Sequence, residues 1–131
     1  MDIHPTSVVS KKAIIGTNVK IGPYTVIDDD VQIGDNVEIG PSVYITGNTF
    51  IDNGVYIGKG SVIGTPPQDR GYKRENSRVI IGKGSVIREY VTVHKATGED
   101  NATIIGSDCY IMAYAHIAHN CRLGDGVTIA N

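Results

Sequence analysis

A six-residue period restricts the fold of this chain more than any other feature of its sequence. Branched aliphatic residues recur at this spacing in one phase from Ile3 to Ile129, with two interruptions. A second series of small or β-branched residues stands four positions after the aliphatics, from Ala13 to Val127. One face of an α-helix recurs every three or four residues, so a helix does not explain this period. Six residues instead suit one short strand followed by a turn.

Three such units are enough to close a triangular coil of about 18 residues. Stacked coils lie about 4.8 Å apart and share parallel ladder hydrogen bonds, and both residue series then point inward. The sequence therefore predicts an all-β fold, a parallel β-helix of roughly six coils that forms a triangular prism. The period does not determine the handedness of the helix. One internal column is expected to contain Ile3, Ile21, Ile39 and Ile57.

Two stretches interrupt the period, and each is predicted to be a loop that protrudes from a corner of the prism. The first, residues 65–77, contains two prolines and several charged side chains that an inward face would not accept. The second covers about residues 95–101. When twelve residues are set aside for the first loop and six for the second, the period continues in register, with Val79 and Thr103 at small positions. We therefore expect one domain over residues 1–131, with functional residues on its loops.

Charge and composition exclude several classes of protein. Twelve Lys and Arg residues against fourteen Asp and Glu residues give a formal charge of -2, too weak a field to recruit nucleic acid or an anionic membrane. The first ten residues lack a basic segment followed by an apolar run, and no stretch is long enough to span a bilayer. We therefore expect a cytoplasmic protein. Cys109 and Cys121 occupy inward small positions, which indicates free thiols and no disulfide or metal pair.

Three of the four histidines fall on outward positions, where the core does not need them. His4 lies in the first turn beside a proline and is assigned no role. When the six residues of the second loop are set aside, His94 and His119 are 19 positions apart, close to one coil. The rings of His94 and His119 are therefore expected to lie near one another at a single corner, and His116 is a third outward histidine. Outward histidines are also common as solvated surface residues, so the spacing alone leaves both interpretations open.

Three segments of the sequence point to a known family. Residues 111–124 resemble the active-site coil of the acyl-carrier-protein-dependent UDP-N-acetylglucosamine O-acyltransferases of lipid A biosynthesis, which are hexapeptide-repeat proteins. Residues 67–72 are similar to the substrate loop of that family, and residues 87–95 to its coil with a motif histidine. The resemblance covers nearly all of the chain and matches the N-terminal part of these enzymes. It implies a left-handed helix, a homotrimer with sites between neighbouring subunits, and no cofactor or metal.

The resemblance also implies a reaction and a role for each site residue. A 3-hydroxyacyl chain is transferred from acyl carrier protein to the 3-hydroxyl of UDP-N-acetylglucosamine, the first step of lipid A biosynthesis. His119 is then the general base, because a sugar hydroxyl needs a base to take its proton as it attacks the thioester. His94 and His116 bind or orient substrate. Gln68 and Asp69 lie in the substrate loop, where a carboxylate can accept hydrogen bonds from sugar hydroxyls.

Two residues depart from the family pattern. Asn120 stands where the family usually has an Asp that orients the catalytic ring; its carbonyl oxygen can still accept a hydrogen bond from Nδ1–H, but it supplies no negative charge. Gly71 stands where the family has a Lys. Arg70 and Lys73 are the candidates to replace its contact to phosphate or carbonyl oxygen, although neither occupies the matching position.

Other functions remain open at this point. A related hexapeptide N-acyltransferase of the same pathway has His-Asn at the matching position, as here. A γ-type carbonic anhydrase uses the same prism and three zinc-binding histidines, but His116 and His119 alone are a poor metal signature. The resembling enzymes also continue through further coils and a helical domain that this chain lacks. A truncated chain that acts as a non-catalytic β-solenoid scaffold is therefore a further alternative.

Overall fold

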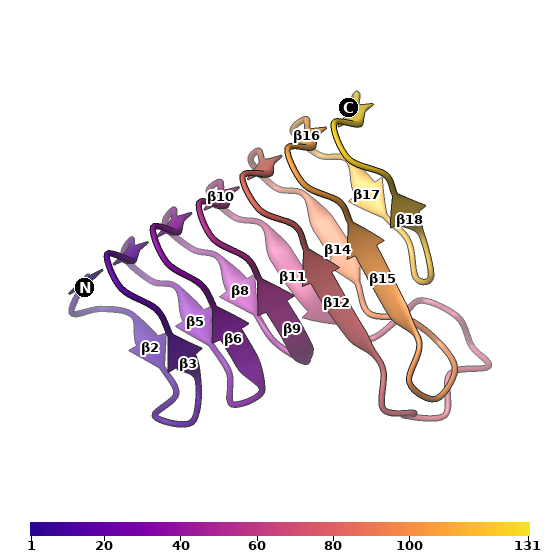
Figure 1. Ribbon diagram of the computed structural model, residues 1–131. Helices are drawn as coiled ribbons and strands as arrows, with labels where there is room; N and C mark the ends of the chain where they lie inside the picture. The colour runs from indigo at the N-terminus through magenta and orange to yellow at the C-terminus, as the bar shows by residue number, and fades with distance from the viewer.

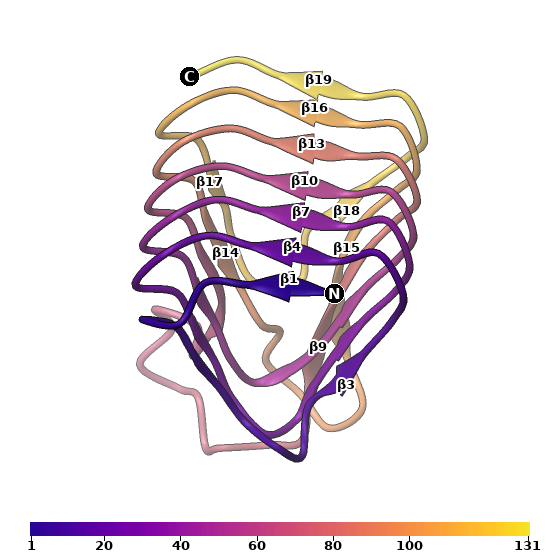
Figure 2. The same ribbon diagram turned by 90° about the vertical axis from the view of Figure 1, so that its left-hand side faces the viewer.

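The computed structural model describes residues 1–131 and consists of short parallel strands wound into a prism (Figure 1). Consecutive strands belong to three different sheets in turn, so that each sheet forms one side of the prism, as the end view in Figure 2 shows. The first sheet contains β1 (Asp2–Ile3), β4 (Lys20–Ile21), β7 (Glu38–Ile39), β10 (Tyr56–Ile57), β13 (Val86–Ile87), β16 (Tyr110–Ile111) and β19 (Thr128–Ile129). The second contains β2 (Val8–Val9), β5 (Val26–Ile27), β8 (Tyr44–Ile45), β11 (Val62–Thr65), β14 (Thr92–His94) and β17 (His116–Ile117). The third contains β3 (Ile14–Ile15), β6 (Val31–Ile33), β9 (Asn48–Ile51), β12 (Arg78–Ile81), β15 (Ala102–Ile105) and β18 (Arg122–Leu123).

The strand register confirms the predicted period. In the first sheet Ile3 pairs with Ile21, which pairs with Ile39, and that residue pairs with Ile57. The third sheet keeps its internal column across both interruptions, because Ile51 pairs with Ile81 and Ile81 pairs with Ile105. The insertions therefore lengthen two coils without changing which residues face inward.

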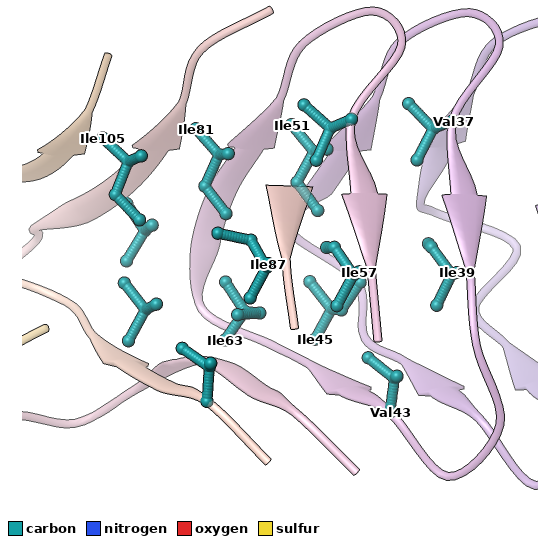
Figure 3. Close-up of a cluster of buried hydrophobic side chains, with 14 of the residues drawn as sticks. Val37, Ile39, Val43, Ile45, Ile51, Ile57, Ile63, Ile81, Ile87 and Ile105 are labelled. Atoms are coloured by element: carbon teal, nitrogen blue, oxygen red, sulfur yellow. The ribbon is translucent and has the colours of Figure 1, made fainter. Parts of the chain in front are cut away.

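The core is built from stacked aliphatic side chains (Figure 3). Ile45, Ile51 and Ile57 are fully buried, whereas the residue before each inward position points to solvent. Each buried aliphatic contributes roughly 1.5–3 kcal/mol relative to an exposed one. The only phenylalanine, Phe50, faces outward, because identical Ile and Val side chains on successive coils already fill the interior.

Hydroxyl groups at the small inward positions link one coil to the next. Thr25 Oγ1 donates to the Gly40 carbonyl at 2.8 Å, and Ser61 Oγ donates to the Arg88 carbonyl at 2.8 Å. A buried hydroxyl without such a partner would be costly. These bonds explain why Thr and Ser are acceptable at core positions.

One corner of the prism differs from the other two. At this corner, between the second and third sheets, the chain leaves the helix twice, between β11 and β12 and between β14 and β15. The segments are residues 66–77, hereafter the first loop, and residues 95–101, the second loop. Thr65, expected at the start of the first loop, instead pairs with His94 and ends β11. Both loops project at the lower right of Figure 1, beside the turn between β17 and β18.

The structure contains strands and turns, and no helix in it is long and apolar enough to cross a membrane.

Candidate active site

The corner with the two loops brings the candidate residues together. Strands β14 and β17 are neighbours in the second sheet, so that Thr92 lies beside His116 and Val93 beside Ile117. His94 ends β14, and His119 lies in the turn that follows β17. The parallel ladder therefore places all three predicted histidines on adjacent coils.

His94 and His116 make direct ring contact. Their ring centroids are 4.6 Å apart and the planes are inclined by 70°, an edge-to-face arrangement. Nδ1 of His94 is buried and has no hydrogen-bond partner in the chain. Burial lowers the pKa of His94, and the neighbouring charges of His116 and His119 lower it further. His94 is therefore held in its neutral form.

His116 has a partner at each ring nitrogen. Its Nδ1 lies 2.7 Å from Thr92 Oγ1, and its Nε2 lies 3.5 Å from Gln68 Nε2 of the first loop. An amide nitrogen only donates, so Nε2 accepts and Nδ1–H donates to the threonine hydroxyl. This places Gln68 over the histidine cluster.

His119 is oriented by the residue that follows it. Its Nδ1 lies 2.9 Å from Oδ1 of Asn120. Asn120 adopts a positive φ of 65°, a conformation that Asn tolerates better than most residues, and its backbone N–H donates to Thr103 Oγ1 at 3.0 Å. The turn thus presents the side chain of Asn120 to the His119 ring. It leaves Nε2 of His119 without a partner in the chain.

The remaining predicted residues lie on the exposed part of the first loop. Asp69 Oδ1 accepts a hydrogen bond from the Gly71 N–H at 2.8 Å, which orients the carboxylate and leaves its other oxygen available. Arg70 and Lys73 are exposed and carry positive charge at the same tip. The geometry brings Gln68 to the histidines, whereas these three side chains contact none of them.

The first loop is attached to the second by a carboxylate. Glu75 Oε1 accepts from the Gly98 N–H at 3.0 Å, and Oε2 accepts from the Lys73 N–H at 2.6 Å. Backbone hydrogen bonds, first from the N–H of Glu75 itself and then from those of Gly98 and Lys73, hold the pKa of Glu75 below its usual value. Lys95 Nζ also lies 5.6 Å from the centre of the Tyr72 ring, a cation–π contact between the loops.

No group of three or more His, Cys, Asp and Glu side chains within the chain is arranged to hold a metal ion. Cys109 is buried and free, and its Sγ lies 3.1 Å from the Gly124 carbonyl oxygen. Cys121 is also free and half-buried. Neither thiol reaches the histidine cluster through a contact that the structure shows.

Comparison with known proteins defines the family. Residues 12–47 and 102–131 match the family described as bacterial transferase hexapeptide with six repeats. The chain belongs to this hexapeptide transferase family. The matched residues include the turn with His119 and Asn120, together with the coils at the opposite end.

Two relatives extend the match beyond the repeat itself. The chain is 46% identical over 131 residues to an acyl-[acyl-carrier-protein]–UDP-N-acetylglucosamine O-acyltransferase from Thermodesulfovibrio yellowstonii, which covers 99% of this chain and 51% of the relative. It is 51% identical over 124 residues to an enzyme of the same name from Sulfurihydrogenibium, covering 94% of this chain and 46% of the relative. The predicted resemblance is thus confirmed, and the chain spans about half the length of these relatives.

A solved structure confirms the fold. The UDP-N-acetylglucosamine acyltransferase from Bacteroides fragilis superposes with a TM-score of 0.95 at 38% identity, covering 98% of this chain and 51% of that one. The hexapeptide transferase described here is therefore a left-handed parallel β-helix, as expected from the resemblance.

The sequence reasoning missed three residues of this hexapeptide transferase site. Thr92 supports His116, Thr97 contacts Asn120, and Glu75 joins the loops. Thr92 was detectable in principle, because the interrupted period places it one coil before His116 on the same outward column. Thr97 and Glu75 lie in irregular segments, where no period predicts neighbours.

The lowered pKa of His94 predicts a pH-dependent stability. Between the pKa in the folded chain and the ordinary value of about 6.5, the unfolded chain binds a proton that the folded chain does not. The free energy of unfolding should therefore rise with pH across this window, so that the contribution is complete above about pH 6.5 and is lost as the pH falls through the window. Urea unfolding at about pH 5.5 and about pH 7 measures the slope, and His94→Gln should reduce it. An unchanged slope in the variant would assign the effect to other groups.

Proposed function

We propose that this chain carries the catalytic histidine of an acyltransferase that moves a 3-hydroxyacyl chain from acyl carrier protein to the 3-hydroxyl of UDP-N-acetylglucosamine, the first step of lipid A biosynthesis. The observation that carries the proposal is the contact between His119 Nδ1 and Asn120 Oδ1 at 2.9 Å, which leaves Nε2 open beside the two loops. The names of the relatives support the substrates. The acyl carrier protein and the nucleotide sugar are then the partners, and the cytoplasm is the expected location.

The proposed chemistry needs one proton acceptor and no covalent enzyme intermediate. Nε2 of His119 takes the proton of the sugar hydroxyl while the hydroxyl oxygen attacks the thioester carbonyl carbon. Nδ1–H donates to Asn120 and stabilises the ring orientation as the imidazolium forms. When the carbon–sulfur bond breaks, the imidazolium returns the proton to the leaving thiolate. An imidazole is suited to both steps near neutral pH.

The other residues are proposed to hold the acceptor sugar. Gln68 and Asp69 offer an amide and a carboxylate to sugar hydroxyls, while Arg70 and Lys73 place positive charge where the diphosphate would lie. His94 and His116 form one wall of the site. The neutral state of His94 suits a contact to an uncharged hydroxyl, because a neutral ring can accept as well as donate.

We also propose that the active form is a homotrimer. Apolar side chains are exposed on the outer faces of the second and third sheets, on both sides of the corner with the loops; Val8 and Ile14 are 65% and 62% exposed. Exposed apolar side chains on two neighbouring sheets favour an association face. If the second sheet of each subunit packs on the third sheet of its neighbour, three copies can close a ring. None of the three hollows of the chain is lined by His94, His116 or His119, so a neighbouring subunit would be needed to enclose the site.

Mass spectrometry of the reaction mixture tests the proposed function. The purified chain is incubated with UDP-N-acetylglucosamine and a series of 3-hydroxyacyl carrier proteins, and a product heavier by one acyl group is expected. Light scattering on the same sample should give a particle three times the 14.0 kDa of one chain. No product from a folded trimer would reject catalysis by this chain and favour the scaffold.

A further inference from the structure

The second loop contacts the side chain that orients the catalytic histidine. Asn120 Oδ1 accepts from the backbone N–H of Thr97 at 2.9 Å and from Thr97 Oγ1 at 3.1 Å. Asn120 Nδ2 donates to the Thr97 carbonyl at 3.0 Å. One residue of the loop therefore engages both ends of the amide.

These contacts allow a single orientation of the amide. The backbone N–H of Thr97 can only donate and its carbonyl can only accept. If the Asn120 amide rotated by half a turn, Nδ2 would face the N–H and Oδ1 would face the carbonyl, so both interactions would become repulsive. The orientation with Oδ1 toward the N–H is thus selected by the loop, and the same Oδ1 lies 2.9 Å from His119 Nδ1.

Thr97 is itself held in place by its neighbours. Its carbonyl accepts a second hydrogen bond from Asn101 Nδ2 at 2.9 Å. The next residue, Gly98, donates its backbone N–H to Glu75 Oε1 of the first loop at 3.0 Å. The loop that fixes the amide is therefore coupled to the loop that bears Gln68.

We propose that Thr97 is a positioning residue that selects the tautomer of His119 through Asn120, an inference that rests on the proposed function. Because Oδ1 is an acceptor, the facing Nδ1 of the neutral ring must carry the proton, and Nε2 is left as the base. An unrestrained amide could also present Nδ2 to the ring, which would favour a proton on Nε2 and remove the base. The loop thus excludes the inactive arrangement.

The tautomer can be observed without any assay of activity. Imidazole ¹⁵N chemical shifts of the purified chain, recorded at a pH at which imidazole rings are neutral, distinguish a proton on Nδ1 from one on Nε2. The wild-type chain should show the Nδ1–H form. Thr97→Pro removes the backbone N–H that selects the amide orientation, so it should lower the fraction of that form, and kcat should fall about two- to fivefold with KM unchanged. Asn101→Ala removes a hydrogen bond that holds the Thr97 carbonyl and should shift the tautomer in the same direction, so it replaces the proline variant if that variant does not fold.

Two variants serve as controls. Thr97→Ser and Thr97→Val change the side chain but keep the backbone N–H and carbonyl, so both should retain the Nδ1–H form. An Nε2–H ring in the wild-type chain, or equal tautomer fractions in Thr97→Pro and Thr97→Val, would overturn the inference. A tautomer that responds to Thr97→Pro in a chain without acyl transfer would reject the proposed function and leave the positioning role standing.

Discussion

Replacing His119, the proposed general base, with alanine should reduce the proposed acyl transfer by about a hundredfold to ten-thousandfold, because the variant has no group to take the proton of the sugar hydroxyl. His119 lies in a turn on the outside of the prism, so the core should be unaffected. The initial rate of product formation by mass spectrometry measures the effect. The effect should appear in kcat more than in KM, since the base acts mainly in the transition state.

His4→Ala is the matched control for this experiment. His4 is exposed in the first turn, and its Nδ1 contacts only Thr6, at 2.9 Å from Oγ1. The control should retain the wild-type rate, and both variants should unfold at the wild-type urea concentration. A His119→Ala chain that keeps more than about a tenth of the rate would remove His119 as the general base.

Replacing Gly64 with alanine should cause a large loss of stability. Gly64 has a φ of 92°, which an L-residue adopts only with strain. A Cβ atom at this position would overlap the Thr46 carbonyl oxygen and the Thr49 hydroxyl of the preceding coil. Neither group is free to retreat, because Thr49 Oγ1 donates to that carbonyl at 2.7 Å. We expect a loss of at least about 3 kcal/mol in the free energy of unfolding.

Gly54→Ala separates the effect of the Cβ overlap from the effect of the positive φ. Gly54 also has a positive φ, of 70°, but no atom lies within 4 Å of the position its Cβ would occupy. This variant should lose only about 1 kcal/mol. Urea unfolding followed by circular dichroism compares the two. Similar losses at both glycines would show that the close approach of the coils at Gly64 is not important for stability.

Gly64 also lies close in the chain to the candidate active site. It belongs to β11, two residues before the first loop, and Thr65 beside it pairs with His94. A displaced coil at Gly64 would therefore move both Gln68 and His94. The close stacking that allows the prism to form also determines where the first loop begins.

The six-residue period of the sequence was sufficient to predict the coils, their register and the inward columns. Val79 and Thr103 were correctly assigned inward positions although a loop precedes each of them, and both are fully buried. This succeeded because every coil repeats the same geometry, so a count of residues along the chain translates directly into a position on the prism. The likeness of the sequence to the acyltransferases was also recognisable, because its three segments occur in order at matching spacing.

The tertiary structure decided what a count of residues does not encode. The left-handed sense of the coils depends on how the corners turn, and the period is the same for either hand. Spacing suggested His94 and His119 as neighbours, but the ring contact of His94 is with His116, because adjacent strands in the second sheet align His116 with Thr92. The orientation of the Asn120 amide depends on Thr97, whose loop has no period and whose place is set by hydrogen bonds to other coils. Sequence alone thus determined the prism and its columns, whereas the contacts across its irregular corner exist only once the coils are stacked.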